Sequence, residues 1–280
     1  MPHEALINGV PADASVLQER AFQFGDGLFE TIAVIDGRPC LWDGHLARLA
    51  EGCRRLKLPL PDSESLLQEC RRLTTTKQRA VLKMFVTAGR SPRGYRRPTT
   101  LMSDRILYVS DWPGADADQP WRVRLCKHRL SSNPVLAQIK HLNRLDQVIA
   151  RAEWNDPSIA EGLMLDQRGQ VVSGSMSNLY LQFGDRLITP PIEDAGIAGV
   201  VRGLAIQIGQ QRGSPLSIEP CSVERVRAAD ALYLSNSLIG VRRIGWLEAR
   251  AYAWQSAEHP VMALTRERCH RADSTEPSDG

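Results

Sequence analysis

The order of strand-like and helix-like segments is the sequence feature that most constrains the fold of this chain. An alternating stretch at 29–35 leads into Asp36-Gly37, a strong signal for a two-residue hairpin turn, and apolar residues at helical spacing follow over 43–58. Strands and helices then continue without the regular alternation of a doubly wound sheet, so we predict an α+β fold. The further elements expected are strands at 79–88, 105–110, 121–127, 178–183 and 230–235, a hairpin at 162–173, and helices at 62–75, at 142–154 and from 200 to 213.

A stretch with few apolar side chains divides the chain into two parts. The 280 residues are enough for two domains, and 111–119 (DWPGADADQ) contains a proline, a glycine and three aspartates. We expect a small N-terminal α/β domain at 1–112, an interdomain linker at 113–120 and a larger C-terminal domain at 121–272. The polar end of the chain, 273–280, is expected to be disordered.

Composition argues against several classes of protein. The net charge of +3 is too small to indicate a nucleic-acid binder, and no apolar run approaches the ~18 residues of a membrane-spanning helix. The six cysteines form no CxxC pair, and no spacing of histidine, cysteine or acidic residues predicts a metal site. Because the sequence begins without the basic and apolar regions of a secretory leader, we expect a cytoplasmic protein with reduced, buried thiols.

Lys140 carries the strongest chemical signal in the chain. It follows an apolar-edged stretch at 135–139 and precedes a segment with the apolar spacing of an amphipathic helix. An amine held at such an edge can lose its hydration, which lowers its pKa and makes it nucleophilic, as a Schiff-base lysine requires. Most lysines beside helices are simply solvated, so the spacing alone leaves both interpretations open.

Three further segments could bind an anion. Gly196–Gly199 opens a helix whose first backbone N–H groups could bind phosphate, and Ser235-Asn236-Ser237 offers short polar donors at a strand end. His45 and Arg48 lie on one face of the first helix, where Arg48 could supply a full positive charge. Each segment also has an ordinary explanation, as a helix entry, a strand end or a surface cation. The arginines at 90–97 are likewise either a solvated loop or a site for carboxylate or phosphate.

Taken in order, these segments make the chain similar to the class-IV aminotransferase family, the fold-type-IV pyridoxal-phosphate enzymes. The resemblance runs from about Ile7 to Trp246, which is nearly the whole chain. It rests on FGDGLFET (24–31), HLARL (45–49), the Arg-Gly-Tyr at 93–95, KHLNRLDQ (140–147), SGSMSNLY (173–180), GIAGVVRG (196–203) and LSNSLIGV (234–241). It implies a two-domain homodimer, similar in fold to D-amino-acid aminotransferase, with pyridoxal 5′-phosphate at the domain interface.

Two of these motifs, KHLNRLDQ and GDGLFET, most resemble one branch of the family. Its members are lyases that convert 4-amino-4-deoxychorismate to pyruvate and 4-aminobenzoate, a folate precursor. The resemblance therefore implies a small-molecule substrate, with no nucleic acid, metal or membrane as a partner.

The family's functional positions carry over residue by residue. Lys140 matches the lysine that bonds the cofactor, and Arg48 matches the arginine that binds the cofactor phosphate. The other cofactor-binding positions are Ser173 and Asn178 on the ring side, the helix-start backbone donors Val200 and Val201, and the second phosphate loop, Ser237 and Leu238. The substrate-binding positions are Phe29, Arg93 and Tyr95. Arg93 and Tyr95 match a loop that meets substrate carboxylates, in relatives often across the dimer interface.

One position departs from the family pattern. A glutamate, hydrogen-bonded to the pyridine nitrogen, usually stands five residues before the asparagine that is Asn178 here, but this chain has Ser173. A carboxylate keeps that nitrogen protonated and makes the ring a strong electron sink, on which a transaminase depends. The lyase needs this sink less, because loss of the C4 proton expels enolpyruvate and leaves an aromatic ring. Ser173 therefore favours a lyase over a transaminase.

Three alternatives stay open at this point. The first is a D-amino-acid or branched-chain aminotransferase of the same family. The second is a pyridoxal-phosphate-binding protein that has lost catalysis, in which Ser173 would be a sign of that loss. An arginine-rich nucleic-acid binder is the least favoured, because no aromatic platform is interleaved with the basic residues.

Overall fold

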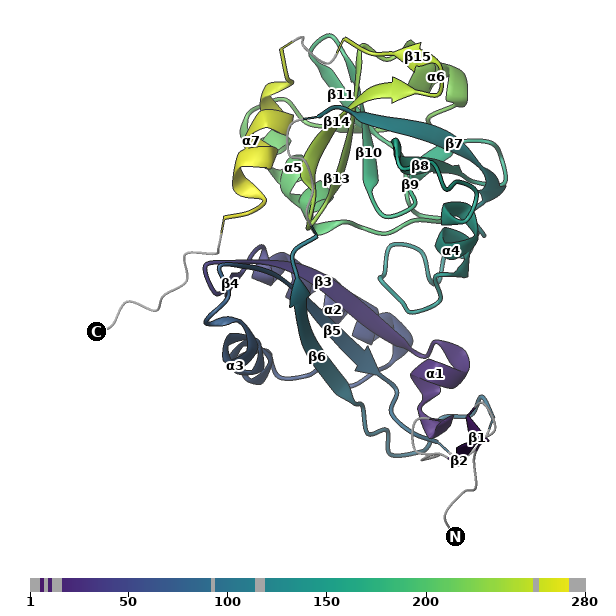
Figure 1. The fold of residues 1–280 in the computed structure, drawn as a ribbon, viewed down its shortest axis with the longest axis vertical. Coiled ribbons are helices and arrows are strands. Elements are labelled where there is room, and N and C mark those ends of the chain that lie inside the picture. The colour runs from purple at the N-terminus through teal and green to yellow at the C-terminus, as the bar shows by residue number, and fades with distance from the viewer. Residues whose placement is uncertain are drawn as a thin grey trace, which may run out of the picture.

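A computed structural model of the chain describes residues 6–7, 10–11, 17–91, 94–113, 119–253 and 257–271. These residues form two large sheets, each with its own helices, one above the other in Figure 1. A short antiparallel pair, β1 (Leu6–Ile7) and β2 (Val10–Pro11), precedes them. The predicted tail at 273–280 and most of the predicted linker (114–118) lie outside the described residues.

The four antiparallel strands of the N-terminal sheet run in the order β4-β3-β5-β6. Their bounds are β3 (Gly27–Ile35), β4 (Arg38–Pro39), β5 (Arg79–Thr87) and β6 (Arg105–Asp111). The predicted hairpin turn between β3 and β4 is confirmed. Both of its central residues, Asp36 and Gly37, have positive φ (49° and 77°), as the turn that matches the twist of a hairpin requires.

The helices of this half are α1 (Arg20–Phe24), α2 (Trp42–Leu56) and α3 (Ser63–Thr74). α3 begins where the side chain of Asp62 accepts a hydrogen bond from the Ser65 N–H at 2.8 Å. The even-numbered apolar residues of β3 and β5 pack with α2 and α3 into one core that includes Ile32, Leu49, Leu66 and Leu82. The opposite face of the sheet, called here the site face, carries Phe29, Thr31, Lys83, Phe85 and Tyr108.

The second sheet, the C-terminal sheet, has nine strands in the order β12-β11-β10-β13-β14-β7-β8-β9, with β15 paired to β14. A further pairing of β9 with β10 joins Ser173 to Asn178 and closes six of the strands into a barrel-like ring. The strand bounds are β7 (Trp121–Arg129), β8 (Ile159–Leu165), β9 (Val171–Gly174), β10 (Asn178–Phe183), β11 (Arg186–Thr189), β12 (Ser217–Ile218), β13 (Ala231–Asn236), β14 (Gly240–Leu247) and β15 (Arg250–Ala251).

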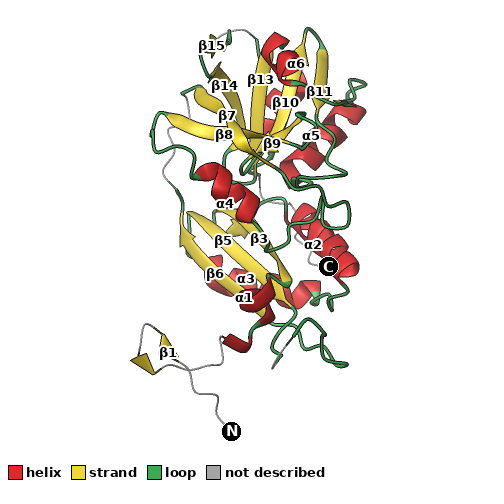
Figure 2. Cartoon of the chain, turned by 90° about the vertical axis from the view of Figure 1, so that its right-hand side faces the viewer, coloured by secondary structure: helices red, strands yellow, loops and turns green. Residues whose placement is uncertain are grey.

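Four helices pack around this sheet: α4 (Leu145–Arg151), α5 (Val200–Gln211), α6 (Val223–Ala228) and α7 (Pro260–Arg268). Figures 1 and 2 place α4 at the end of the C-terminal sheet that faces the N-terminal sheet. The mixture of helices with two largely antiparallel sheets confirms the predicted α+β fold. All six cysteines are buried and free, as expected. Among the described residues, no helix combines the length and the apolar character needed to span a bilayer.

One helix begins later than predicted. The helix expected at 142–154 is α4, which starts only at Leu145. The residues before it use their backbone to pair with the N-terminal sheet: the Phe29 N–H donates to the Lys140 carbonyl, and the Leu142 N–H donates to the Gly27 carbonyl, both at 3.0 Å. The bridge between His141 and Leu28 keeps this segment alongside β3, and the chain turns into the helix only after it. The prediction of helix at 142–144 was wrong for this reason.

Candidate active site

Lys140 lies where the two sheets meet. On one side its segment pairs with the turn before α5, since Gln138 exchanges backbone hydrogen bonds with Gly196 and Ala198, each at 2.9 Å. On the other side it pairs with β3, and the Lys140 Nζ lies 4.1 Å from the ring centroid of Phe29 on the site face. These backbone contacts on two sides hold the amine in place.

The pKa of the Lys140 amine lies far below that of an ordinary lysine. Burial is the largest cause that lowers its pKa, and the positive charge of Arg48 lowers it further, to about 7, against the opposing effect of Glu30. Near neutral pH a large share of the amine is therefore unprotonated. That form is the one that can act as a nucleophile or as a base.

A buried polar cluster lies behind Lys140 on the α2 side of β3. Glu30 accepts hydrogen bonds from His45 Nδ1 at 2.7 Å and from Arg48 Nε at 2.8 Å, and it forms a second contact with Arg48 Nη2. Burial alone would raise the pKa of Glu30, but the charge and hydrogen bonds of Arg48 outweigh it and hold the pKa at about 2. Burial lowers the pKa of His45, and its Nε2 has no hydrogen-bond partner among the described residues.

Arg48 also connects the two halves of the molecule. Its Nη1 donates to the Ala198 carbonyl at 3.0 Å, in the turn that precedes α5. Each of its three nitrogens therefore already has a protein partner, although Nη1 and Nη2 each carry a second hydrogen. Those remaining hydrogens are what Arg48 could offer to a phosphate group.

The N-terminus of α5 is free of a side-chain cap. Its N-cap residue is Gly199, which offers no side-chain acceptor, and the helix continues with Val200 and Val201. The first N–H groups of a helix have no partner within the helix, so these donors are available to an anion. Asn178 supports the turn from β10, because its Nδ2 donates to the Ile197 carbonyl at 3.0 Å. A Cβ atom at Gly199 would lie only 2.0 Å from Asn178 Oδ1, which explains the glycine.

The second predicted phosphate loop meets β3. Ser237 Oγ donates to the Thr31 carbonyl at 2.6 Å, one residue from Glu30. The Leu238 N–H donates to the side chain of Asn236 at 2.8 Å, which folds this segment into a turn. The predicted cofactor residues Arg48, Asn178, Val200, Val201 and Ser237 thus come from both halves of the chain. Their segments contact β3 or the turn before α5, the two elements with which the Lys140 segment pairs.

Ser173 lies beside Asn178 across the β9–β10 pair and is buried. Its hydroxyl donates to the Gly174 carbonyl at 2.9 Å. The oxygen retains its lone pairs as acceptors, but it provides no negative charge to a pyridine nitrogen.

The predicted substrate residues are described only in part. Phe29 lies against Lys140, and Tyr95 is 86% exposed, with its ring 5.2 Å from that of Phe24. Arg93 lies outside the described residues. Tyr95 and Phe24 line a cavity of about 490 Å³ that reaches His141, the residue after Lys140.

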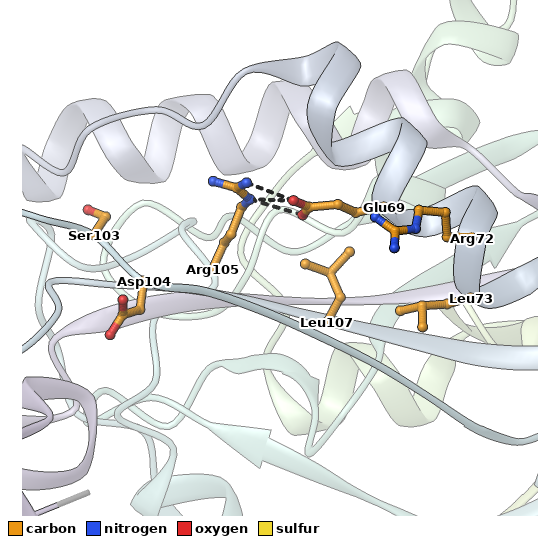
Figure 3. A pocket seen from close by; sticks show the side chains of 7 residues that line it. All are labelled: Glu69, Arg72, Leu73, Ser103, Asp104, Arg105 and Leu107. Atoms are coloured by element: carbon orange, nitrogen blue, oxygen red, sulfur yellow. Dashed lines mark hydrogen bonds and ion pairs between the residues drawn. The ribbon is translucent and has the colours of Figure 1, made fainter. Parts of the chain in front are cut away.

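A second cavity, also of about 490 Å³, lies between α3 and β6 and is unrelated to this site. Figure 3 shows its lining, in which Glu69 and Arg105 form an ion pair at 2.7 Å. Arg105 and Leu107 point to the α3 side of β6, whereas Phe29 and Tyr108 point to the site face. This cavity therefore lies on the opposite face of the N-terminal sheet from Lys140.

Sequence reasoning missed the buried acid Glu30, described above, and a second one, Glu161 on β8. It is fully buried and hydrogen-bonded to the turn that leads into Asn178. The signal available was a glutamate inside the otherwise apolar strand IAEGLML (159–165). No group of three or more His, Cys, Asp or Glu side chains is placed to bind a metal ion in the part of the chain that the structure describes.

Residues 27–245 match the class-IV aminotransferase family, and the chain belongs to that family. Enzymes of this family and its lyase branch depend on pyridoxal 5′-phosphate. The residues present fit this cofactor: a buried amine with a pKa near 7, a helix N-terminus without a cap and an arginine with spare donors converge at one place.

Within the family, the chain is similar to proteins named as lyases. It is 28% identical to aminodeoxychorismate lyase from Vibrio harveyi over 93% of this chain and 96% of the relative. The crystal structure of 4-amino-4-deoxychorismate lyase from Pseudomonas aeruginosa is 40% identical, with a TM-score of 0.83, and the match covers 93% of this chain and 95% of that one. Branched-chain amino acid aminotransferase from Escherichia coli, with a TM-score of 0.79, 19% identity and coverage of 98% and 95%, shares the fold. These matches confirm the fold-type-IV architecture.

Proposed function

We propose that this chain is a 4-amino-4-deoxychorismate lyase, which converts 4-amino-4-deoxychorismate to 4-aminobenzoate and pyruvate. The proposal is carried by the buried amine of Lys140, whose pKa burial lowers to about 7, together with a buried serine rather than a carboxylate at position 173, across from Asn178 in the β9–β10 pair. The 40% identical structural relative is named for the same reaction. 4-Aminobenzoate is a folate precursor, so the proposed role is in folate biosynthesis.

The cofactor would lie between the two sheets. Lys140 Nζ would hold it covalently, and the backbone N–H groups of Val200 and Val201 would bind its phosphate. Arg48 and the Ser237–Leu238 turn would contribute to the same phosphate site. Ser173 and Asn178 would face its ring. Pyridoxal phosphate, when bound, withdraws electrons from the carbon that carries the substrate amine and so makes the C4 proton acidic.

Lys140 would then move the protons of the reaction. The Lys140 amine, released when the substrate amine takes its place on the cofactor, would in its neutral form take the C4 proton. The C3–O bond would then break, and the substrate ring would become aromatic as enolpyruvate leaves. The protonated amine can return the proton to enolpyruvate to give pyruvate. Arg93 and Tyr95 would bind a substrate carboxylate, a role for which a guanidinium fork is suited.

The missing carboxylate at position 173 supports the lyase over a transaminase. A transaminase has no aromatisation to drive its proton transfer and depends on a protonated pyridine nitrogen. The Ser173 hydroxyl, which already donates to the Gly174 carbonyl, provides no charge to hold that proton. We therefore expect pyruvate release from aminodeoxychorismate to exceed keto-acid formation from D-alanine or branched-chain amino acids by orders of magnitude.

The test uses the purified protein and Lys140→Ala. The wild type should show the absorbance of lysine-bound pyridoxal phosphate, and borohydride should fix the cofactor onto Lys140. The variant should lose this absorbance and its turnover of aminodeoxychorismate. Turnover that survives in Lys140→Ala would exclude the proposed mechanism. Binding of the cofactor without turnover of either substrate class would indicate a protein that has lost catalysis.

We also propose a homodimer. The outward face of α4 exposes Leu145, Val148 and Ile149, at 72%, 60% and 50%. Three neighbouring apolar side chains on a short helix close to Lys140 are typical of a surface covered by another chain. Sedimentation should show a dimer, and Val148→Glu should shift it toward monomer. The six buried free thiols support a reducing, cytoplasmic location.

A further inference from the structure

Glu161 is a buried carboxylate that the proposed mechanism does not use. It lies on β8 between apolar neighbours and has no exposed surface. An ionised carboxylate in such a place needs strong hydrogen bonds to offset its lost hydration.

The hydrogen bonds come from one turn of the chain. Glu161 accepts from the Ser175 N–H at 3.1 Å, Ser175 Oγ at 2.5 Å, the Met176 N–H at 3.2 Å and Ser177 Oγ at 2.9 Å. The N–H of the next residue along β8, Gly162, adds a fifth at 2.9 Å. All of these donors are neutral, and together they give both oxygens of the buried carboxylate hydrogen-bond partners.

The turn closes tightly over this carboxylate. A Cβ atom at Gly174 would lie 2.8 Å from Glu161 Oε2 and 2.1 Å from Ser177 Oγ. Only glycine leaves room for both contacts, so the shape of the 174–177 turn depends on the carboxylate beneath it.

This turn joins two parts of the candidate cofactor site. Its ends are Ser173 and Asn178, which pair across β9–β10 and form the ring side of that site. Its middle is tied to the second phosphate loop, because Asn236 Nδ2 donates to the Met176 carbonyl at 3.1 Å. The Oδ1 of the same Asn236 accepts from the N–H groups of Leu238 at 2.8 Å and Ile239 at 2.9 Å.

We infer that Glu161 is a positioning residue for the cofactor. Its carboxylate holds the 174–177 turn, and the turn holds Asn178 on the ring side and, through Asn236, the Ser237–Leu238 loop on the phosphate side. This inference rests on the proposed cofactor site, but it does not depend on which substrate the enzyme takes.

The test is the affinity of the apoprotein for pyridoxal phosphate. Glu161→Gln preserves the size of the side chain but places an amide NH₂ against N–H and O–H donors. We expect it to weaken pyridoxal-phosphate binding about tenfold or more, and to shift the absorption maximum of the bound cofactor. Ser177→Ala removes one donor and leaves the carboxylate, so it should weaken binding in the same direction by a smaller factor.

Tyr252→Phe is the matched control. It removes a buried hydrogen bond of the same half of the chain, from Tyr252 to the Val226 carbonyl at 3.0 Å. It should lower the thermal stability of the apoprotein without changing cofactor affinity or absorbance. If Glu161→Gln likewise lowers only the thermal stability and leaves cofactor affinity and absorbance unchanged, Glu161 has only a structural role and the inference is wrong. If Glu161→Gln fails to fold, unchanged affinity in Ser177→Ala overturns it equally. Failure of the proposed function would show instead as wild-type protein that binds the cofactor and releases no pyruvate.

Discussion

The Nζ of Lys140 lies 4.1 Å from the ring centroid of Phe29, although the two residues are far apart in the chain and Lys140 lies outside the strands, between β7 and α4. The backbone of Lys140 is bonded to that of Phe29 as well. The reactive amine is therefore held by the N-terminal sheet, while the helix N-terminus that would bind a phosphate belongs to the C-terminal half.

The buried amine makes the stability of the apoprotein depend on pH. The folded state lowers the pKa of Lys140 to about 7 from the ordinary 10.5, so between these values the unfolded chain binds more protons than the folded one. The contribution of Lys140 to the free energy of unfolding therefore rises as pH increases through this window. We expect urea denaturation to show Lys140→Met more stable than the wild type near neutral pH, with the difference shrinking as pH approaches 10. A difference that does not change with pH would contradict a buried neutral amine.

Glu30→Gln tests the electrostatic cluster behind the amine. Glu30 raises the pKa of Lys140, so its loss should lower that pKa further and move the acid limb of the pH–activity profile to lower pH. It also leaves the charge of Arg48 without its buried partner, at a cost of about 3–5 kcal/mol in unfolding free energy.

The control for Glu30→Gln is Glu51→Gln on the exposed side of α2. Glu51 pairs with Arg54 and Arg55 at the surface, where such pairs contribute about 0–1 kcal/mol. It should leave both the pH profile and the stability nearly unchanged. An unchanged acid limb in Glu30→Gln would show that Glu30 does not act on the amine.

Ser173→Glu tests the choice between lyase and transaminase. A carboxylate beside Asn178 would hold a proton on the pyridine nitrogen and strengthen the electron sink. We expect the rate of keto-acid formation from D-alanine to rise relative to pyruvate release from aminodeoxychorismate. The site is buried, so the variant should also be less stable. An unchanged ratio of the two rates, measured on folded variant, would show that position 173 does not set reaction type.

Gly199→Ala tests the phosphate site at the start of α5. The new Cβ would lie 2.0 Å from Asn178 Oδ1, so the helix start or Asn178 must move. We expect weaker pyridoxal-phosphate binding and a lower melting temperature. Gly203→Ala in the same helix is the control, since nothing lies within 4 Å of its Cβ, and it should stabilise the protein by about 0.5–1 kcal/mol. Equal cofactor affinity in the two variants would argue against phosphate binding at this helix.

Elements that depend on local signals were predicted well. The strand at 178–183 has the bounds of β10, and the predicted helices at 43–58 and 62–75 correspond to α2 and α3 within two residues at each end. The hairpin at Asp36-Gly37 also formed as predicted. Periodicity, caps and turn residues act over a few positions, and the sequence shows them directly.

Elements that depend on distant partners were predicted less well. The helix predicted at 142–154 begins only at Leu145, because the preceding segment pairs its backbone with β3. β14 was not predicted, because Arg242 and Arg243 interrupt its apolar pattern. It is a strand because it pairs with β13 on one side and with β7 on the other. Glu161 was missed because its importance lies in a turn that follows it by more than ten residues.

The sequence by itself determined the α+β class, the order of the motifs and the types of residue available for chemistry: the lysine at 140, the arginine at 48 and the turns at 196–199 and 235–237. Only the tertiary structure decided which elements these groups lie on side by side, that the Lys140 amine is desolvated, and that Glu161 lies beneath the 174–177 turn. The physical reason is that both features depend on residues from other parts of the chain. The pKa of Lys140, near 7, results from its burial and from the charges of several neighbours, and Glu161 accepts its five hydrogen bonds mostly from a turn more than ten residues further along the chain. A pattern in a short stretch of sequence does not show such long-range contacts.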